Sequence, residues 1–429
     1  MKTTRREFLA AASALGFGAA AGPAFAQQRT LTYIGWSHDE AASKPVLTEM
    51  FNAFSTANPS VRLETIGFPW AQMQQNLILR MRAGQPLDVA QLAERWLPTF
   101  AALNNLADLN ELFGRAALEE KIDAGLLRIG QSGGKQLGLP WTAASIGMVA
   151  NRKVLGDAGV NQIPTTVDQF VGALRAIKRS NPEAVPYALA TKNNLSMSPD
   201  FQVWLWTFGG RLLDNDGAVK VNGEAGVRAL SFLVDLMKEN LAARDIDRPD
   251  ARRLFGQHRT GFYADAPLAR GFARDNSGQG RAFDQYVAAA PYPVVAAGNN
   301  PQSVAWGHLL VMPIIGGRRP TRDGDAARFV QHLAFNDDMQ MKYFEAVGLF
   351  PVTKTALARV RDDAYVTQWA RYASFAEADE PSKWANAADL TTIVGEEVQA
   401  ALLQQKPPQQ AIADMARRLE QRMRDVRRG

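Results

Sequence analysis

Residue patterns that could support covalent chemistry are few in this sequence. Residues 130–134 match G-x-S-x-G, the turn that presents a nucleophilic serine between a buried strand and a helix. Here the apolar run before the motif, residues 126–129, is short, and the residues from Lys135 onward favour a strand instead of a helix. We therefore interpret residues 130–134 as a surface turn.

Metal-ligand patterns are equally scarce. The chain has four histidines and no cysteine, and no two histidines stand four residues apart, as a zinc-binding H-E-x-x-H helix requires. Residues 214–217, D-N-D-G, match the start of a calcium loop but lack the glutamate at its twelfth position, so a hairpin turn explains them better. The sequence thus predicts no catalytic residue, no metal site and no cofactor.

Tryptophan is the residue type that points to binding. The chain has nine tryptophans, several of them where a strand ends or the chain changes direction. Indole faces stack on the apolar faces of sugar rings, and sugar hydroxyls bond well to carboxylates and guanidinium groups. Five tryptophans are therefore candidate ligand contacts, with core packing as the alternative for each: Trp36, Trp70, Trp141, Trp206 and Trp306. We assign Trp96, Trp204 and Trp369 to the core.

The first part of the chain alternates between strand and helix patterns. Strand patterns occur at 31–36, 61–66 and 87–92, whereas apolar residues recur at helical spacing at 44–58 and 70–83. This order predicts right-handed crossovers and a mostly parallel sheet. Ligands of such sheets bind beyond the carboxyl ends of the strands, which places the residues after the first and third strands in a cleft.

Two later segments are expected to cross between two bodies of structure. Residues 133–155 predict two short strands joined end to end, and residues 304–311 predict the strand by which the chain returns. Further strands are expected at 187–190, 259–264 and 286–291. Further helices are expected after Thr166, at 223–240, 326–335 and 338–347, and over most of 389–429.

Three runs of residues carry a family resemblance. They are A-G-Q-P-L-D-V at 83–89, G-K-Q-L-G-L-P at 134–140 with N-R-K-V-L at 151–155, and W-L-W-T-F-G-G-R-L-L-D-N-D-G-A-V-K-V-N at 204–222. In this order they resemble the sugar-type periplasmic solute-binding proteins of ABC importers, extracellular solute-binding family 1, which includes maltose- and glycerol-phosphate-binding-like members. The first run has one extra residue between proline and aspartate, and the resemblance covers nearly the whole chain after residue 26.

The resemblance implies the α/β fold of type II periplasmic binding proteins. Two hinge-linked lobes would each hold a central, mostly parallel sheet flanked by helices, and they would close over a ligand by hinge motion. The first lobe would comprise residues 27–142 with 303–340, and the second residues 143–302 with 341–429. A length of 429 residues is consistent with two hydrophobic cores.

The resemblance also assigns residues to the ligand site. The family's sugar-contacting acidic and basic residues fall in the loops after the first and third strands, and further contacts come from the second lobe. Besides the tryptophans, the assigned residues are His38, Asp39, Glu94, Arg95, Asn193, Asp265 and Phe350. Maltose-like members carry a tyrosine near Pro199 and a tryptophan near Leu268; this chain has neither, so maltodextrin is not the expected ligand.

The first 26 residues predict export. Lys2, Arg5 and Arg6 precede an apolar run, and an A-x-A cleavage site ends at Ala26. The run T-R-R-E-F-L at 4–9 has the form read by the twin-arginine export machinery, with an ordinary signal peptide as the alternative. We therefore expect a periplasmic protein, cleaved near Ala26, and the absence of cysteine removes the residue that would carry a lipid anchor.

The expected function is capture of a small carbohydrate or polyol, with or without a phosphate group, by a monomer that delivers it to ABC transporter permease subunits. No nucleic-acid partner is expected, because the basic run at 417–428 contains no aromatic residue for base stacking. Two alternatives stay open. One keeps the fold but binds an anion or a peptide, and the other is a secreted glycoside hydrolase that uses Asp39 and Glu94 as its carboxylate pair.

Overall fold

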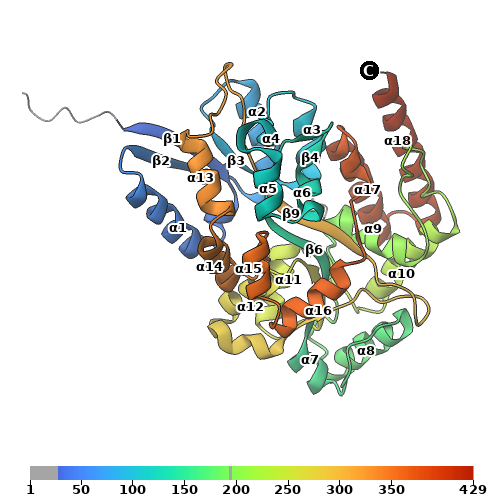
Figure 1. Ribbon diagram of the computed structural model, residues 1–429. Coiled ribbons are helices and arrows are strands. Elements are labelled where there is room, and N and C mark those ends of the chain that lie inside the picture. The colour runs from blue at the N-terminus through green and yellow to red at the C-terminus, as the bar shows by residue number, and fades with distance from the viewer. Residues whose placement is uncertain (1–27, 193–195, 429) are drawn as a thin grey trace, which may run out of the picture.

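The computed structural model describes residues 28–192 and 196–428, which form a mixed α/β structure around one curled sheet of eight strands (Figure 1). The predicted signal sequence lies outside the described residues. The strand order is β2-β1-β3-β9-β6-β7, with β8 beside β6 and β10 beside β9. These strands are β1 (Arg29–Gly35), β2 (Val61–Gly67), β3 (Val89–Ala93), β6 (Leu139–Asn151), β7 (Phe262–Asp265), β8 (Val287–Ala290), β9 (Ser303–Val311) and β10 (Ala376–Glu377).

The sheet has two regions that share β6. Residues 139–146 of β6 pair with β9, which continues through β3 to β1 and β2; we call this the first sheet region. Residues 147–151 of β6 pair with β7 and β8, which form the second sheet region. The prediction of two short strands at 133–155 is therefore wrong: β6 is one strand, irregular only between Pro140 and Thr142, where proline offers no N–H to the ladder.

Strand direction differs between the predicted and observed sheet. The pairs β1–β2 and β1–β3 are parallel, as the predicted strand–helix alternation requires. The pairs that involve β6, and the pair β3–β9, are antiparallel. The physical reason is that β6 and β9 carry the chain in opposite directions between the two regions, so that they meet antiparallel.

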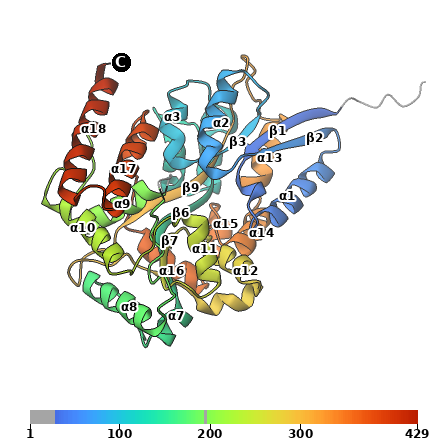
Figure 2. The same ribbon diagram turned by 180° about the vertical axis from the view of Figure 1, so that it is seen from behind.

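Helices surround the first sheet region on both faces. Figure 1 shows α4–α6 and α13 in front of the sheet, and Figure 2 shows α2 and α3 on the opposite face. The α1 and α2 crossovers match the predicted helices, because their apolar residues recur on one face. The helices are α1 (Lys44–Ala57), α2 (Trp70–Arg82), α3 (Leu97–Ala101), α4 (Leu109–Phe113), α5 (Arg115–Lys121), α6 (Ala124–Leu127) and α13 (Asp325–Ala334).

A second group of helices surrounds the second sheet region. They are α7 (Arg152–Asp157), α8 (Val167–Ser180), α9 (Met197–Thr207), α10 (Glu224–Lys238), α11 (Arg248–Gly256) and α12 (Ala269–Ser277). Thr166 caps α8 as predicted, in a reciprocal capping box with Gln169. The predicted strand at 187–190 is wrong, because the segment makes only a single bridge, between Tyr187 and Phe262, and its hydrogen bonds to the start of β7 end at Ala188.

The C-terminal part of the chain is helical, as predicted. It consists of α14 (Asp337–Val347), α15 (Lys354–Arg359), α16 (Ala364–Ala373), α17 (Ala387–Leu402) and α18 (Pro408–Arg428). Arg418 and Arg422 of α18 pair with the carboxylates of Glu397 and Asp389 on α17, so these members of the basic run hold two helices together. Among the described helices, none is both long and apolar enough for a membrane span.

The two motifs with possible chemistry prove to be turns. Gly133 and Gly134, both at positive φ, join β4 (Gln131–Ser132) to β5 (Lys135–Gln136) in a two-stranded hairpin. The Asp214 carboxylate accepts the backbone N–H groups of Asp216 and Ala218 within a second hairpin turn. Both interpretations made from the sequence are confirmed at these positions.

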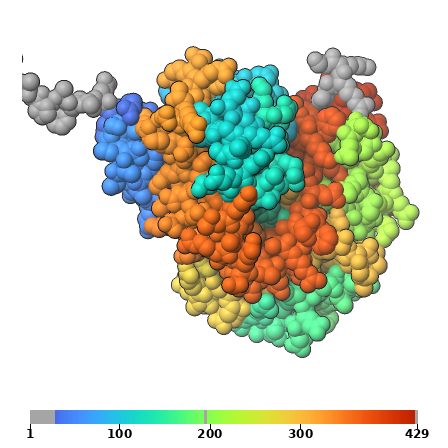
Figure 3. All heavy atoms as spheres, viewed as in Figure 1, coloured from blue at the N-terminus to red at the C-terminus, as the bar shows by residue number. Residues whose placement is uncertain are grey.

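The space-filling view shows where the two halves of the molecule touch on one face. Figure 3 shows the α4–α6 segment, in cyan, directly above α15 and α16, in orange. Lys354 Nζ donates a hydrogen bond of 2.6 Å to the carbonyl of Glu119, and Ile122 forms a bridge with Thr353. These contacts join the two halves of the molecule on this face.

A buried carboxylate fixes the loop before α17. Glu380, which is 4% exposed, accepts hydrogen bonds from Trp206 Nε1 at 2.7 Å and from the backbone N–H groups of Leu212 and Leu213 at 2.6 and 2.9 Å. Arg211 lies 3.4 Å away and pairs at 2.7 Å with the exposed Glu377. Glu380 thus satisfies three buried donors at once.

We predict that Glu380→Ala destabilises the protein by about 3 kcal/mol or more, because three buried N–H groups lose their acceptor and Arg211 loses its buried partner. Glu377→Ala removes an exposed partner of the same arginine and should cost less than about 1 kcal/mol. Urea unfolding of both variants measures the difference. Equal losses would show that Glu380 acts only as a surface ion-pair partner.

Candidate ligand-binding cleft

A cavity of about 260 Å³ lies between the two sheet regions, beside β6 and β9, which we call the crossing strands. Figure 2 shows α2 and α3 on one side of these strands and α11 and α12 on the other. The loops that follow β1, β2 and β3 contribute Trp36, Glu40, Trp70 and Arg95. The opposite side contributes Pro199, Arg248, Arg252, Asp265 and Leu268, and the crossing strands contribute Ile146 and Trp306.

One wall of the cavity is aromatic. Trp36 meets Trp70 edge to face, with ring centroids 4.8 Å apart, and Trp70 stacks on Trp96 at 4.6 Å. The Arg95 guanidinium lies 5.3 Å from the Trp70 centroid. Trp306 packs on the buried ring of His308 at 4.4 Å. Because each ring is held by another ring, the wall presents rigid apolar faces to the cavity.

A buried glutamine positions the loop that carries Trp36. The fully buried Gln91 accepts hydrogen bonds of 3.2 Å each from the backbone N–H groups of Trp36 and Ser37. Its Nε2 donates to Ser37 Oγ at 2.7 Å and to His308 Nδ1 at 3.1 Å. Burial lowers the pKa of His308 to about 3, so the ring stays neutral and its Nδ1 can accept. A Cβ at Gly35 would lie 2.8 Å from Gln91 Oε1, which explains the glycine.

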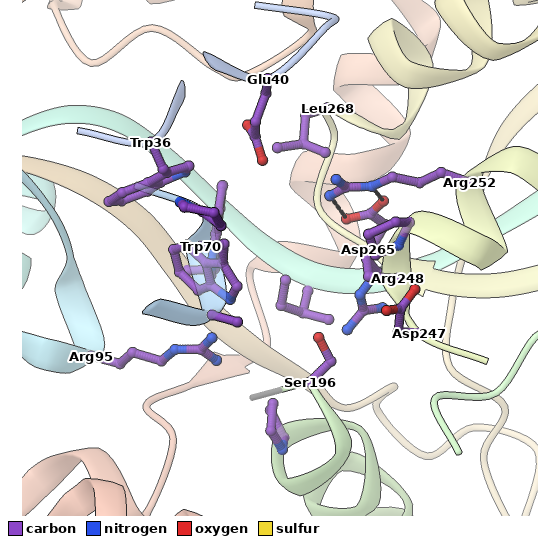
Figure 4. A pocket seen from close by; sticks show the side chains of 16 residues that line it. Trp36, Glu40, Trp70, Arg95, Ser196, Asp247, Arg248, Arg252, Asp265 and Leu268 are labelled. Atoms are coloured by element: carbon purple, nitrogen blue, oxygen red, sulfur yellow. Dashed lines mark hydrogen bonds and ion pairs between the residues drawn. The ribbon is translucent and has the colours of Figure 1, made fainter. Parts of the chain in front are cut away.

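The opposite wall consists of paired charges. Arg252 donates to both carboxylate oxygens of Asp265, at 2.8 and 3.0 Å (Figure 4). Arg248 donates to Asp200 at 2.8 Å. Both arginines belong to α11 and stand four residues apart, so they share one helix face. Asp247 caps this helix in a capping box with Asp250.

Glu40 lies where the two walls meet. It follows η1 (Ser37–Asp39), and Figure 4 shows its carboxyl oxygens pointing into the space between Trp36 and Arg252. Removal from water raises the pKa of Glu40 to about 7, against the opposing effect of Arg252 and with a further increase from Asp265. This residue therefore presents a carboxyl group whose charge changes near neutral pH.

Five residues that the sequence assigned to the site line the cavity. They are Trp36, Trp70, Arg95, Asp265 and Trp306. Glu94 lies behind Arg95 in η2 (Glu94–Trp96), where its Oε2 accepts the Gly307 N–H at 2.8 Å. Asn193 falls outside the described residues.

The other assigned residues lie away from the cavity. His38 packs on Tyr33 with centroids 5.5 Å apart, and the exposed Asp39 covers Gly67. Trp141 is fully buried and stacks on Tyr343, with ring centroids 4.9 Å apart. The Trp206 indole donates its hydrogen bond to the buried Glu380. Phe350 packs among core residues near the crossing strands. All of these side chains except the exposed Asp39 pack in the protein interior.

Several cavity residues were not assigned from the sequence. The sequence alone favours Asp39 over its neighbour Glu40, because the 3-10 turn after β1 decides which of the two faces inward. Arg248 and Arg252 could have been found from the sequence. They stand four residues apart at the start of a helix that the Asp247–Asp250 capping box marks, so both side chains are expected on one helix face. In the described part of the chain, no three histidine or acidic side chains are placed to hold a metal ion.

Comparison with known proteins identifies the family. Residues 35–340 match the family described as bacterial extracellular solute-binding protein, so the chain belongs to this family. The diacetylchitobiose binding protein DasA of Streptomyces coelicolor is 27% identical over 45% of each chain. A Sinorhizobium fredii protein named "Probable amino-acid ABC transporter periplasmic-binding protein" is 26% identical over 99% of each chain.

Solved structures confirm the fold class. The GacH receptor of Streptomyces glaucescens superposes with a TM-score of 0.81 at 20% identity, covering 93% of this chain and 99% of that one. A solute binding protein of Thermotoga lettingae bound with alpha-D-tagatose gives 0.80 at 21% identity, covering 92% and 100%. The chain therefore has the two-lobed fold of periplasmic binding proteins, as the sequence predicted.

We predict a pH-dependent stability difference at Glu94. Burial raises the pKa of its carboxyl to about 7, against the opposing effect of Arg95, whereas an exposed glutamate ionises near 4.5. The unfolded chain therefore releases this proton at lower pH than the folded chain, and folding stability falls as pH rises toward and through 7. Glu94→Gln keeps an acceptor for the Gly307 N–H and removes this proton.

Relative to wild type, the unfolding free energy of Glu94→Gln should therefore increase from pH 5 to about pH 7 and level off toward pH 8. Urea unfolding across this range measures it, and other titrating groups cancel in the comparison. A difference that does not change with pH would contradict the raised pKa.

Proposed function

We propose that this protein is the periplasmic substrate-binding component of an ABC importer and that it captures a small carbohydrate or polyol in the cleft. The observation that carries the proposal is the pairing of a rigid indole wall with a wall of arginine–carboxylate pairs across one cavity. The protein would act as a monomer, bind without turnover and deliver its ligand to the permease subunits.

The two walls suit the two kinds of surface on a sugar ring. The C–H face is apolar and packs on Trp36, Trp70 or Trp306. The hydroxyl groups both donate and accept, and the Arg252–Asp265 pair offers donors and acceptors side by side without leaving a net charge. A sugar can therefore pack its C–H face on the tryptophan wall while its hydroxyl groups bond to the Arg252–Asp265 pair.

The size of the cavity favours a short ligand. Cavities for drug-sized ligands measure roughly 300–1,000 Å³, so about 260 Å³ suits one or two sugar rings. Pro199 and Leu268 line the cavity, and the maltose-like members that this chain resembles carry a tyrosine near Pro199 and a tryptophan near Leu268. This chain thus lacks two of the stacking surfaces that a longer glucan would use.

The names of similar proteins favour sugars, although not uniformly. DasA is named for diacetylchitobiose, the Thermotoga lettingae protein was crystallised with tagatose, and the GacH receptor with acarbose. The Sinorhizobium fredii relative is named for amino acids. Three of these four are carbohydrate ligands, which supports the assignment made from the cavity.

Capture requires the two lobes to close on the ligand. We propose that residues 27–142 with 303–340 form the first lobe and residues 143–302 with 341–429 the second. On β6 the partner strands change between Ile146 and Gly147, and bending there would separate the tryptophan wall from α11. A ligand shifts this equilibrium only by binding the closed form more tightly than the open form.

Residues 1–26 would direct export through the twin-arginine machinery and be removed near Ala26. Mass spectrometry of the protein recovered from the periplasm tests this part of the proposal. A mature chain that begins elsewhere would overturn the proposed cleavage site, and export that survives replacement of Arg5 and Arg6 by lysine would overturn the twin-arginine route.

We predict that a thermal-shift screen of the mature protein against mono- and disaccharides and polyols yields a stabilising ligand. At 100 times its dissociation constant, such a ligand adds about 2.7 kcal/mol of stability, or a few degrees in Tm. Trp70→Ala should weaken binding of that ligand at least about tenfold, since it removes a stacking face worth on the order of 1.5 kcal/mol or more.

Leu79→Ala is the matched control, because Leu79 lies on the same helix, is 56% exposed and does not line the cavity. It should leave the affinity unchanged. Stabilisation by peptides or inorganic anions and by no carbohydrate would keep the fold and overturn the ligand class.

A further inference from the structure

Two of the three arginines that line the cavity are bonded to carboxylates, and the third, Arg95, lies near two carboxyl groups. Arg252 donates from Nε and from one terminal nitrogen to the two carboxylate oxygens of Asp265. Arg248 donates to the carboxylate of Asp200. The guanidinium of Arg95 lies close enough to Glu94 and Asp379 to lower the pKa of both carboxyls against the larger, opposite effect of burial. No arginine of the cavity wall is therefore left without an acidic neighbour.

One carboxylate of the cleft has no such partner. Across the described ranges 28–192 and 196–428, the side chain of Glu40 accepts no hydrogen bond and forms no ion pair. Figure 4 shows it pointing into the cavity opposite the Arg252–Asp265 pair. The charged and titratable groups that face it are Arg252 on α11, Asp265 on β7 and Tyr343 on α14. Since Asp265 occupies Arg252, the charge of Glu40 is open to a ligand.

The wider surroundings of the cavity also carry more acidic than basic groups. The acidic groups are Glu40, Glu94, Asp200, Asp247, Asp265 and Asp379. The basic groups are Arg95, Arg248, Arg252 and Lys192, whose Nζ lies 3.7 Å from Asp247. A phosphate or carboxylate in the cavity would meet the unpaired Glu40, two arginines already bonded to carboxylates, and Arg95 beside Glu94 and Asp379, so burying it there is costly.

On the basis of the carbohydrate cleft proposed above, we propose that Glu40 selects a ligand with a primary ammonium group, an amino sugar or an amino polyol. The ammonium group pairs with the Glu40 carboxylate, the ring packs on the tryptophan wall, and the hydroxyls bond to the Arg252–Asp265 pair. The sequence leaves open a phosphorylated ligand, and the charges of the cleft oppose it.

Proton exchange should accompany this binding. With a pKa of about 7, the Glu40 carboxyl is about half protonated in the free protein at neutral pH. An ammonium ion favours the ionised carboxylate, so binding releases the proton. Affinity for the amino ligand should rise from pH 5.5 toward 7.5 and fall again when the ligand amine loses its proton, which for amines beside electron-withdrawing groups occurs at about 8.

Isothermal titration calorimetry tests the proposal with matched probes. The probes are the 2-amino-2-deoxy forms of glucose, galactose and mannose, their N-acetyl derivatives, the parent hexoses and the hexose 6-phosphates. We expect one amino sugar to bind at least tenfold more tightly than its parent and its N-acetyl derivative, and the 6-phosphates not to bind at millimolar concentration. Titrations in two buffers of different ionisation enthalpy should show proton release at pH 7.

Glu40→Gln preserves the shape of the side chain and removes its charge. This variant should lose tenfold or more in affinity for the amino sugar, lose clearly less in affinity for the parent hexose, and release no proton. Glu64→Gln, on the exposed face of β2, is the charge-matched control and should behave as wild type. Unchanged unfolding midpoints show that both variants fold.

The other possible outcomes each contradict one particular part of the proposal. Parent hexoses that bind as tightly as their amino forms overturn the role of Glu40 and leave the carbohydrate cleft intact. Tightest binding by a 6-phosphate overturns the charge argument. Binding of putrescine or amino acids, with no carbohydrate binding at all, overturns the proposed function instead.

Discussion

The antiparallel ladder between β6 and β9 is the constraint on which the rest of this structure depends. Both strands belong to the first sheet region, and β6 continues into the second, so the two regions are parts of one hydrogen-bonded sheet. Trp306 on β9 and Ile146 on β6 place the floor of the cavity on this ladder. The buried Gln91 then ties the loop after β1 to His308 on the same ladder, which fixes the tryptophan wall relative to the crossing strands.

That tie requires an uncharged histidine. A protonated His308 would donate from both ring nitrogens, and Gln91 Nε2 would then face a donor instead of an acceptor. The rings of Trp36 and Trp306 surround the imidazole and keep water away, which holds the ring neutral. The aromatic wall thus forms the ligand surface and also keeps its own anchor in the required state.

Local regularity decided what could be predicted from the sequence. The strands and helices from 29 to 93 were predictable because their periodicity is strong and each element pairs with its neighbour along the chain. At β6, Pro140 and Gly147 resemble breaks, and only the distant β9, β7 and β8 make the strand continuous. In the site, the ends of the strands correctly indicated which loops line the cavity. The choice between Asp39 and Glu40, however, depends on a single 3-10 turn. The burial of Trp141 depends on Tyr343, which is far away in the sequence.

The distribution of charge in the cleft separates binding strength from selectivity. Arg248 and Arg252 reach the cavity already bonded to carboxylates, so a ligand can use them without neutralising a buried ion, and any polyhydroxy compound of suitable shape benefits. A side chain without a partner behaves differently, because ligands that satisfy it and ligands that do not differ by the full cost of a buried polar group. Glu40 is such a side chain, and it stands one residue beyond the turn that Gln91 holds in place. The interaction that fixes the aromatic wall therefore also sets the position of the carboxylate by which we propose that the cleft discriminates between ligands.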